Sequence, residues 1–215
     1  MSNTTYLFHE YLHRSDEVMR RLSEARITVC GAGALGANLV ETLARQGFAN
    51  LRVIDRDRIE ERNLSTQPYF ATDVGAFKAK ILANSLYRAI GVKVDARAEE
   101  LTTTNTAKLL KDCDLVVDTF DNSASRRAVK DYSETAGVQC LHAGLANGYA
   151  EVVWNDIYRV PSAAQDDICD YPLARNLVSL TIAVTAEVIV RFVAGSARQS
   201  FTITLDDFAV RPFQF

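Results

Sequence analysis

The sequence contains few cysteines, and none of them lie close enough together to form a CxxC pair. Its 215 residues include only four cysteines. This wide spacing disfavours both a disulfide framework and a tetrathiolate zinc site. We therefore expect reduced thiols at Cys30, Cys113, Cys140 and Cys169.

The sequence also lacks an excess of positive charge. Its 24 lysines and arginines against 27 aspartates and glutamates give a formal net charge of −3. No global basic field therefore favours direct binding of nucleic acid. A content of 48% apolar and 24% charged residues is ordinary for a globular protein, which excludes the disordered, collagenous and coiled-coil classes.

No apolar signal-peptide core is present at residues 1–10, which are polar, so we expect a cytoplasmic protein. The one long apolar run, Leu177–Ala194, has the length of a membrane span. Within it, however, Glu187 and Arg191 lie four residues apart and can pair on a helix, and its flanks lack anchoring features. We therefore expect a buried or dimer-facing helix and no membrane partner.

Strands alternate with helices along most of the chain, which is typical of an α/β protein with a parallel sheet. We expect a Rossmann-like, mostly parallel sheet with helices on both faces and additional late strands. The length fits a single domain, 1–215. It divides into an N-terminal helical extension (1–25), a nucleotide-binding core (26–155), and a loop, long apolar helix and final strand (156–215).

Hydrophobic periodicity and turn residues place the individual elements. Predicted strands cover Ile27–Cys30, Leu51–Asp55, Val92–Ala96, Leu115–Val117, Gln139–Ala143, Tyr149–Trp154 and, as a last edge strand, Ser200–Leu205. Predicted helices cover Glu17–Glu24, Leu35 to a cap at Gly47, Gly75–Ile90, Thr106–Lys111, Ser123 to near Gly137, and Leu177–Ala194. Residues 56–73 and 160–172 are predicted to be irregular loops.

A glycine motif follows the first predicted strand and opens the first long helix. Gly31, Gly33 and Gly36 form GxGxxG in the strand–turn–helix context that this fingerprint requires. Without Cβ atoms, such a turn lets backbone N–H groups approach phosphates closely. Asp55 ends the second strand, where an acid normally binds ribose hydroxyls. These features predict a nucleotide site and leave NAD and ATP open.

The residues after Asp55 distinguish these nucleotides. They read DRDRIEERNLSTQ as far as Gln67, which resembles the DxDxVxxxNLxRQ pattern of the ThiF/MoeB/HesA family, the bacterial relatives of ubiquitin-activating enzymes. Residues 73–78, DVGAFK, resemble that family's D(I/V)GxxK, and residues 117–126, VDTFDNSASR, resemble its VDxxDNxxxR. The resemblance covers about residues 26–154.

The resemblance implies an ATP-dependent adenylyltransferase. Such an enzyme activates the C-terminal carboxylate of a ubiquitin-like or sulfur-carrier protein as an acyl adenylate, uses ATP and Mg²⁺, and forms a homodimer. A carboxylate that attacks an α-phosphate brings anionic groups together, so the site needs cations aimed at the developing charge.

The resemblance also assigns roles to particular residues. Lys78 is expected to bind phosphate oxygens, although a lone lysine on a helix is usually exposed, and Asp121 is expected to bind Mg²⁺, although it could instead cap a helix. Asn122 and Arg126 match the same motif but could instead fix the strand-to-helix turn. The cofactor-binding residues implied in this way are Gly31, Gly33, Gly36, Asp55, Asp57, Asn63, Gln67 and Lys78.

One departure from the family pattern removes a cation. Thr66 stands where the NLxRQ pattern has arginine, so a positive charge near the phosphates is missing unless another residue supplies it. Candidates are Arg62 and Arg14, the latter as a catalytic arginine reaching across a dimer, as the resemblance implies. The zinc-binding CxxC pairs of the family are also absent.

Cys169 and His142 are two further residues whose side chains could take part in catalysis. Cys169 lies in an acidic loop, DDICD, where nearby carboxylates raise a thiol pKa and reduce its nucleophilicity, so we expect an ordinary cysteine rather than a thioester-forming one. His142 ends a predicted strand and could face the site, but a lone histidine there is more often structural.

Two other functions remain open. A non-catalytic family member that binds nucleotide and serves as a partner subunit would explain the loss of the arginine at Thr66. A NAD-dependent oxidoreductase could use the same glycine turn, but no Tyr/Lys or His/Asp catalytic pairing stands out in the sequence.

Overall fold

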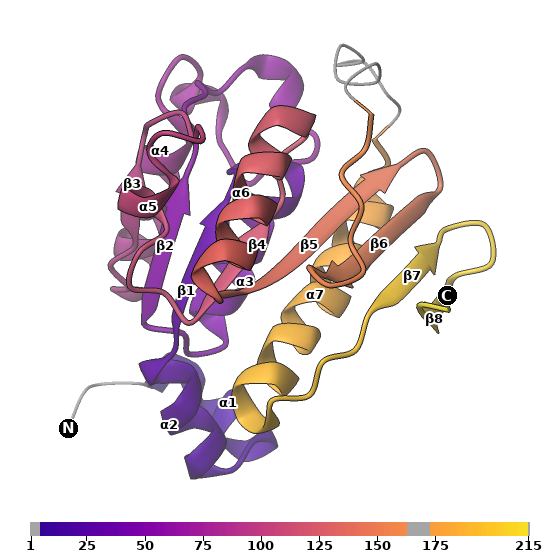
Figure 1. Cartoon of the computed structure of the whole chain (residues 1–215). Helices are drawn as coiled ribbons and strands as arrows, with labels where there is room; N and C mark the ends of the chain where they lie inside the picture. The colour runs from indigo at the N-terminus through magenta and orange to yellow at the C-terminus, as the bar shows by residue number, and fades with distance from the viewer. Residues whose placement is uncertain (1–4, 163–172, 215) are drawn as a thin grey trace.

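The computed structural model describes residues 5–162 and 173–214 and contains an eight-stranded sheet in the order β3-β2-β1-β4-β5-β6-β7-β8 (Figure 1). Strands β1 to β5 pair in parallel, and β6 to β8 extend the sheet antiparallel. The predicted Rossmann-like fold with late additional strands is confirmed. The strands are β1 (Arg26–Cys30), β2 (Asn50–Ile54), β3 (Asp95–Arg97), β4 (Leu115–Asp118), β5 (Gln139–Ala146), β6 (Tyr149–Trp154), β7 (Phe201–Thr204) and β8 (Ala209–Pro212).

Helices cover both faces of the sheet, as its apolar strands require. Alternate residues of one strand point to opposite faces, so Val29 belongs to one hydrophobic cluster and Cys30 to the other. Packed on the first face are α3 (Ala34–Arg45), α4 (Lys78–Ile90) and α7 (Arg175–Gly195); on the second are α5 (Thr106–Leu109) and α6 (Ser123–Ala136).

The N-terminal helices lie at the end of the molecule where the parallel strands begin (Figure 1). A short 3₁₀ turn (Thr5–Leu7) leads into α1 (Phe8–His13) and α2 (Asp16–Glu24). Ser15 caps α2 by accepting a hydrogen bond from the Val18 N–H at 3.3 Å. Helix α2 then packs against α7, which ties the N-terminal extension to the C-terminal part of the chain.

Helix α7 is the one helix of the described residues that is long and apolar enough to cross a membrane. Half of its most apolar window is buried inside the protein, where it contacts α2, α3 and strands β5 to β7. The pairing expected between Glu187 and Arg191 is present, with Arg191 Nε donating to Glu187 Oε1 at 2.9 Å. The helix thus serves as a core helix of this fold.

Several predicted element boundaries were wrong. The strand expected at Val92–Ala96 is β3, Asp95–Arg97. The helix expected from Gly75 begins at Lys78, because Gly75 has φ +90°, a conformation outside the helical region. The strand expected at Ser200–Leu205 is neither last nor at the edge, since β8 pairs with it on its outer side. The sequence signal missed there is the turn between them, at which Phe208 has a positive φ of 53°.

Candidate functional site

The predicted site residues gather at the carboxyl ends of the parallel strands. The chain runs outward from β1 through β2 to β3, and in the other direction from β4 to β5, so neighbouring β1 and β4 form the point where strand order reverses. Ligands of open α/β sheets bind in the crevice outside such a switch point. Gly31 and Thr119, which follow β1 and β4, lie side by side at this point.

Two glycines of the motif are required by close packing. Gly31 has φ +103°, and a Cβ atom there would lie 2.8 Å from Thr119 Oγ1. At Gly36 a Cβ would lie 2.0 Å from the Gly31 carbonyl oxygen, which no adjustment of a side chain can relieve. Gly33 instead precedes α3, and nothing lies within 4 Å of its Cβ position. The turn therefore leaves open space beside the helix N-terminus, where a phosphate can bind.

Asp55 connects the end of β2 to the glycine turn. Its Oδ2 accepts a hydrogen bond from the Ala32 N–H at 2.6 Å, and its Oδ1 accepts one from the Asp57 N–H at 2.6 Å. Burial raises the pKa of this carboxyl, against the opposing effect of the two backbone hydrogen bonds. Asp55 thus holds the turn in shape, and its expected contact with ribose stays a prediction.

Lys78 is the first residue of α4 and lies beside Asp57. Its ammonium nitrogen is 3.5 Å from Asp57 Oδ2, and only 8% of the residue is exposed. An ordinary lysine on a helix extends into water. The burial of Lys78 therefore contradicts the alternative that it is simply an exposed helix residue. A buried ammonium group whose one carboxylate partner is at the edge of hydrogen-bonding range can bind a phosphate oxygen.

The loop of residues 56–73 folds back over the glycine turn. Tyr69 donates its hydroxyl hydrogen to the Ala32 carbonyl at 2.9 Å, and Asn38 of α3 donates to the Thr66 carbonyl at 2.8 Å. The loop contains two 3₁₀ turns, Glu61–Asn63 and Ala71–Asp73. It is therefore an ordered wall of the crevice.

Two predicted binding residues on this loop differ in what they offer a ligand. The Asn63 Oδ1 accepts a hydrogen bond from the Glu60 N–H at 2.9 Å, which fixes the local turn. Gln67 is 9% exposed, and its Oε1 has no hydrogen-bond partner among the described residues. Buried polar atoms are seldom left unpaired, so this amide oxygen is suited to receive a donor from a bound molecule.

Asp121 lies in the bend between β4 and α6, exposed to solvent. The cap of α6 is its neighbour: Asn122 Oδ1 accepts a hydrogen bond from the Ser125 N–H at 2.8 Å. Asp121 is therefore not the cap of α6. Asn122 is the cap, and so it fixes the strand-to-helix turn, which was the structural alternative for this residue. Among the described residues no group of three potential ligands could hold a metal, but magnesium commonly uses one or two carboxylates together with phosphates.

A buried polar network lies beneath this bend. His142 is fully buried, with Nδ1 2.8 Å from Asp118 Oδ2 and Nε2 2.6 Å from Asn155 Oδ1. Arg126 donates to the Tyr158 hydroxyl at 2.7 Å and lies 3.8 Å from Asp118. His142 and Arg126 thus have structural contacts, although Arg126 bonds to Tyr158 and approaches Asp118 rather than fixing the turn itself. The prediction that His142 ends its strand was wrong, because β5 continues to Ala146, and the register of the sheet places His142 opposite Asp118 at the end of β4.

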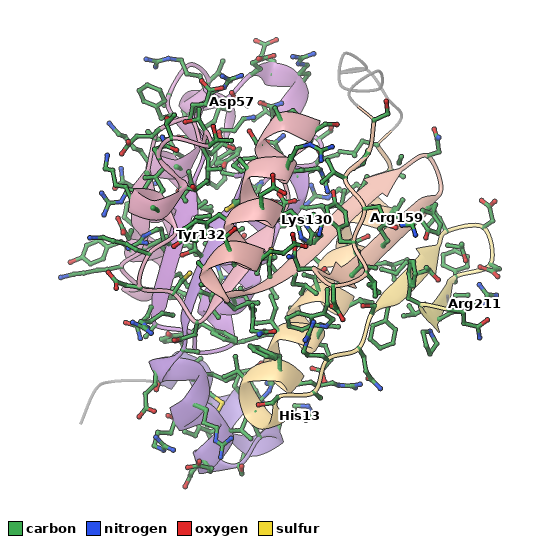
Figure 2. The ribbon with its side chains drawn as sticks, viewed as in Figure 1. His13, Asp57, Lys130, Tyr132, Arg159 and Arg211 are labelled. Atoms are coloured by element: carbon green, nitrogen blue, oxygen red, sulfur yellow. The ribbon has the colours of Figure 1, made fainter. Side chains whose placement is uncertain are left out.

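Arg14 lies away from the crevice of its own chain. It pairs with Glu10 and is 4.0 Å from Glu187 of α7. Figure 2 shows His13, its neighbour, at the opposite end of the molecule from Asp57. One chain therefore does not bring Arg14 to the site, and its expected catalytic role requires a second subunit.

The remaining candidates have simple placements. Arg62 is exposed and donates to Glu60 Oε2 at 2.7 Å. Cys30 and Cys140 are buried strand residues, as expected, and Cys113 is partly buried. Cys169 and most of the irregular loop predicted at residues 160–172 lie outside the described part of the chain, which omits residues 163–172.

Taken together, these residues fit a nucleoside triphosphate. The glycine turn has no room for a side chain at Gly31 or Gly36 but has open space at Gly33. Lys78 lies buried at the start of α4, and the Gln67 Oε1 has no hydrogen-bond partner among the described residues. A free carboxylate follows β4 at Asp121, where a metal bound to the phosphates could meet it.

Comparison with known proteins agrees with this geometry. The chain is 35% identical over 142 residues to a probable adenylyltransferase/sulfurtransferase MoeZ of Mycobacterium tuberculosis, covering 64% of this chain and 36% of that protein. It is 36% identical over 124 residues to a sulfur carrier protein adenylyltransferase of Thermus thermophilus, covering 56% and 45%. The chain thus matches less than half the length of each of these relatives.

The fold is shared with solved structures at lower identity. E. coli MccB with ATP superposes with a TM-score of 0.81 at 20% identity, over 99% of this chain and 72% of that one. At this identity the likeness shows the fold alone. The profile of the ThiF family matches residues 9–203, nearly the whole chain. The chain belongs to the ThiF family.

Proposed function

We propose that this protein is an ATP-dependent adenylyltransferase that activates the C-terminal carboxylate of a ubiquitin-like or sulfur-carrier protein. The observation that carries the proposal is the set of groups near the carboxyl ends of the parallel strands: an open glycine turn, buried Lys78 and solvent-exposed Asp121. The names of the relatives, which are adenylyltransferases of sulfur carriers, support the same chemistry.

In the proposed reaction a carboxylate oxygen of the carrier attacks the α-phosphorus of ATP. A new P–O bond forms, the bond to the bridging oxygen breaks, and pyrophosphate leaves with the electron pair. The α3 N-terminus and Lys78 would bind phosphate oxygens and stabilise the charge that develops there. Mg²⁺ held by Asp121 would neutralise the leaving pyrophosphate. Asp55 and Tyr69 keep the turn rigid, so little reorganisation is needed.

Three further parts of the proposal come from the sequence. The protein is expected to form a homodimer in which Arg14 of one subunit serves the other subunit's site. The carrier is expected to dock beside the late strands. A cytoplasmic location is likewise a prediction from the sequence.

A second candidate function rests on Thr66. A family member without the arginine of the NLxRQ pattern could bind nucleotide and act only as a partner subunit of a complete enzyme. It would then bind ATP without forming an acyl adenylate. The oxidoreductase alternative would show tighter binding of NADH than of ATP.

The test is ATP–pyrophosphate exchange with Mg²⁺ in the presence of purified ubiquitin-fold carriers. Carrier-dependent exchange is expected, and Lys78→Ala and Asp121→Ala should each abolish it. Lys80→Ala and Asp131→Ala are matched controls, because Lys80 is exposed on α4 with Lys78 and Asp131 is an exposed aspartate on α6, the helix that follows Asp121. Wild-type exchange by either site variant would contradict that residue's assignment. ATP binding without exchange would favour the partner-subunit function.

A further inference from the structure

A positive charge from a distant part of the sequence lies next to the position of the missing arginine. Arg175, the first residue of α7, donates from Nη1 to the Ser65 carbonyl oxygen at 2.8 Å across 110 residues of sequence. Ser65 immediately precedes Thr66, where the family pattern has arginine. We propose that Arg175 supplies the cation that binds the β- and γ-phosphates of ATP. This inference rests on the proposed function.

The turn that Arg175 touches belongs to the wall of the crevice. The carbonyl of Thr66 accepts a hydrogen bond from Asn38 at 2.8 Å, and Asn38 also donates to the Ala34 carbonyl at 2.7 Å in the first turn of α3. The Ser65–Thr66 turn is therefore held between Arg175 on one side and the start of the phosphate-binding helix on the other. Hydrogen bonds through this turn and Asn38 therefore connect the Arg175 guanidinium to the first turn of α3, the helix terminus at which the proposed function places phosphate.

The charge of Arg175 is not balanced by a carboxylate within the part of the chain that the structure describes. Among the described residues its guanidinium donates to a neutral carbonyl, which uses one of its five N–H donors. Other cations around the crevice have acidic partners: Lys78 pairs with Asp57, and Arg62 pairs with Glu60. The guanidinium of Arg175 thus has donors left for an anion.

The position of Arg175 on its helix is also unfavourable without an anion. A cation in the first turn opposes the helix dipole, and α7 has neither an acidic residue in its first turn nor a side-chain cap at Ala174. An anionic ligand would turn this local cost into a favourable arrangement, because it would be attracted by both the helix terminus and the guanidinium. The two observations together favour terminal phosphate groups as the partner of Arg175.

The test compares the affinities of ATP and AMP by calorimetry in the absence of carrier. Arg175→Ala is expected to weaken ATP binding roughly tenfold or more, the effect of losing a charge-assisted contact, and to leave AMP binding unchanged. Arg191→Ala is the matched control. Arg191 is an exposed arginine of the same helix, and it pairs with Glu187.

A merely structural role would give a different result. If Arg175 only anchors α7 to the loop, Arg175→Ala would lower the melting temperature and weaken ATP and AMP equally, which would overturn the inference. Unchanged ATP affinity would also overturn it, whether or not carrier-dependent exchange occurs. If the wild-type protein binds ATP but shows no carrier-dependent ATP–pyrophosphate exchange, the proposed catalysis is refuted. The ratio of ATP affinity to AMP affinity in the variants then still decides the role of Arg175. Failure of the wild type to bind ATP would refute both.

Discussion

Single residues of the glycine motif have different physical reasons for being glycine. A Cβ at Gly36 would meet the Gly31 carbonyl at 2.0 Å, whereas a Cβ at Gly33 would point into open space. Gly36→Ala is therefore expected to destabilise the protein by roughly 1–3 kcal/mol or more, as overpacking does. Gly33→Ala should leave stability nearly unchanged and weaken ATP binding, because its methyl group occupies ligand space.

Thermal unfolding and ATP titration of both variants separate the two effects. For a chain of this size, about 1 kcal/mol corresponds to a shift of roughly 2–4 °C in melting temperature. Equal melting temperatures for the two variants would contradict the packing argument. Undiminished ATP affinity in Gly33→Ala would show that the nucleotide does not approach this turn.

Asp118 is a residue whose charge contributes to folding rather than to ligand binding. Burial alone would raise the pKa of its carboxyl, but Arg126 and the hydrogen bond with His142 outweigh burial and hold the pKa below its ordinary value. A carboxyl with a lowered pKa stabilises the folded state above its unfolded pKa, about 3.9, and this contribution disappears as the pH falls through the folded pKa.

Asp118→Asn is therefore expected to cost about 3–5 kcal/mol near pH 7, because it leaves the buried guanidinium of Arg126 without its carboxylate. The deficit should shrink below about pH 4, where the unfolded wild-type carboxyl becomes protonated and then, at still lower pH, the folded one. Urea unfolding of both proteins at pH 7 and at a series of pH values below about 4 measures it. A deficit independent of pH would mean that packing, and not charge, is the cause.

At the scale of elements, helix α6 connects stability to the site. Asn122 caps the helix and directly follows Asp121, so the cap also sets the bend that presents the carboxylate. Asn122→Ala is expected to cost about 1 kcal/mol and to reduce ATP–pyrophosphate exchange, whereas Asn122→Ser retains a capping oxygen and should keep most of both. Exchange unaffected by Asn122→Ala would separate the cap from the function.

The elements also show what a sequence can and cannot predict. The turn at Gly31, the end of α6 near Gly137 and the strand Tyr149–Trp154 depend on local spacing and backbone preference, and the structure has them where they were predicted. The start of α4 was predicted wrongly because Gly75 has a positive φ and lies outside the helix. The strand β8 was missed because the segment that forms it is only weakly apolar.

Contacts between distant segments were beyond prediction from spacing. The pairing of Asp118 with His142 depends on the register of β4 against β5, and the approach of Arg175 to Ser65 depends on how α7 crosses α3. Neither relation leaves a periodic signal in the chain. The motifs could therefore identify the glycine turn, while the cations and the buried network around it could be found only from the fold.

At the scale of the whole molecule, the position of Arg14 links catalysis to assembly. Its neighbour His13 lies at the opposite end of the molecule from Asp57 (Figure 2), and Arg14 itself pairs with Glu10 and lies close to Glu187 on α7. If it is catalytic, it must act on the crevice of a second subunit. Chains with Lys78→Ala and chains with Arg14→Ala would then each be inactive alone, for different reasons.

Co-expression of these two variants provides a direct test. A mixed dimer contains one site with Lys78 from one chain and Arg14 from the other, and random pairing makes half of the dimers mixed, so about a quarter of wild-type exchange should return. The matched control combines Lys78→Ala with Asp121→Ala. Both residues belong to the crevice of a single chain, so no mixed dimer has an intact site. Failure of the first mixture to recover activity, with dimers present, would remove Arg14 from the catalytic site and leave Arg175 as the cation beside Thr66.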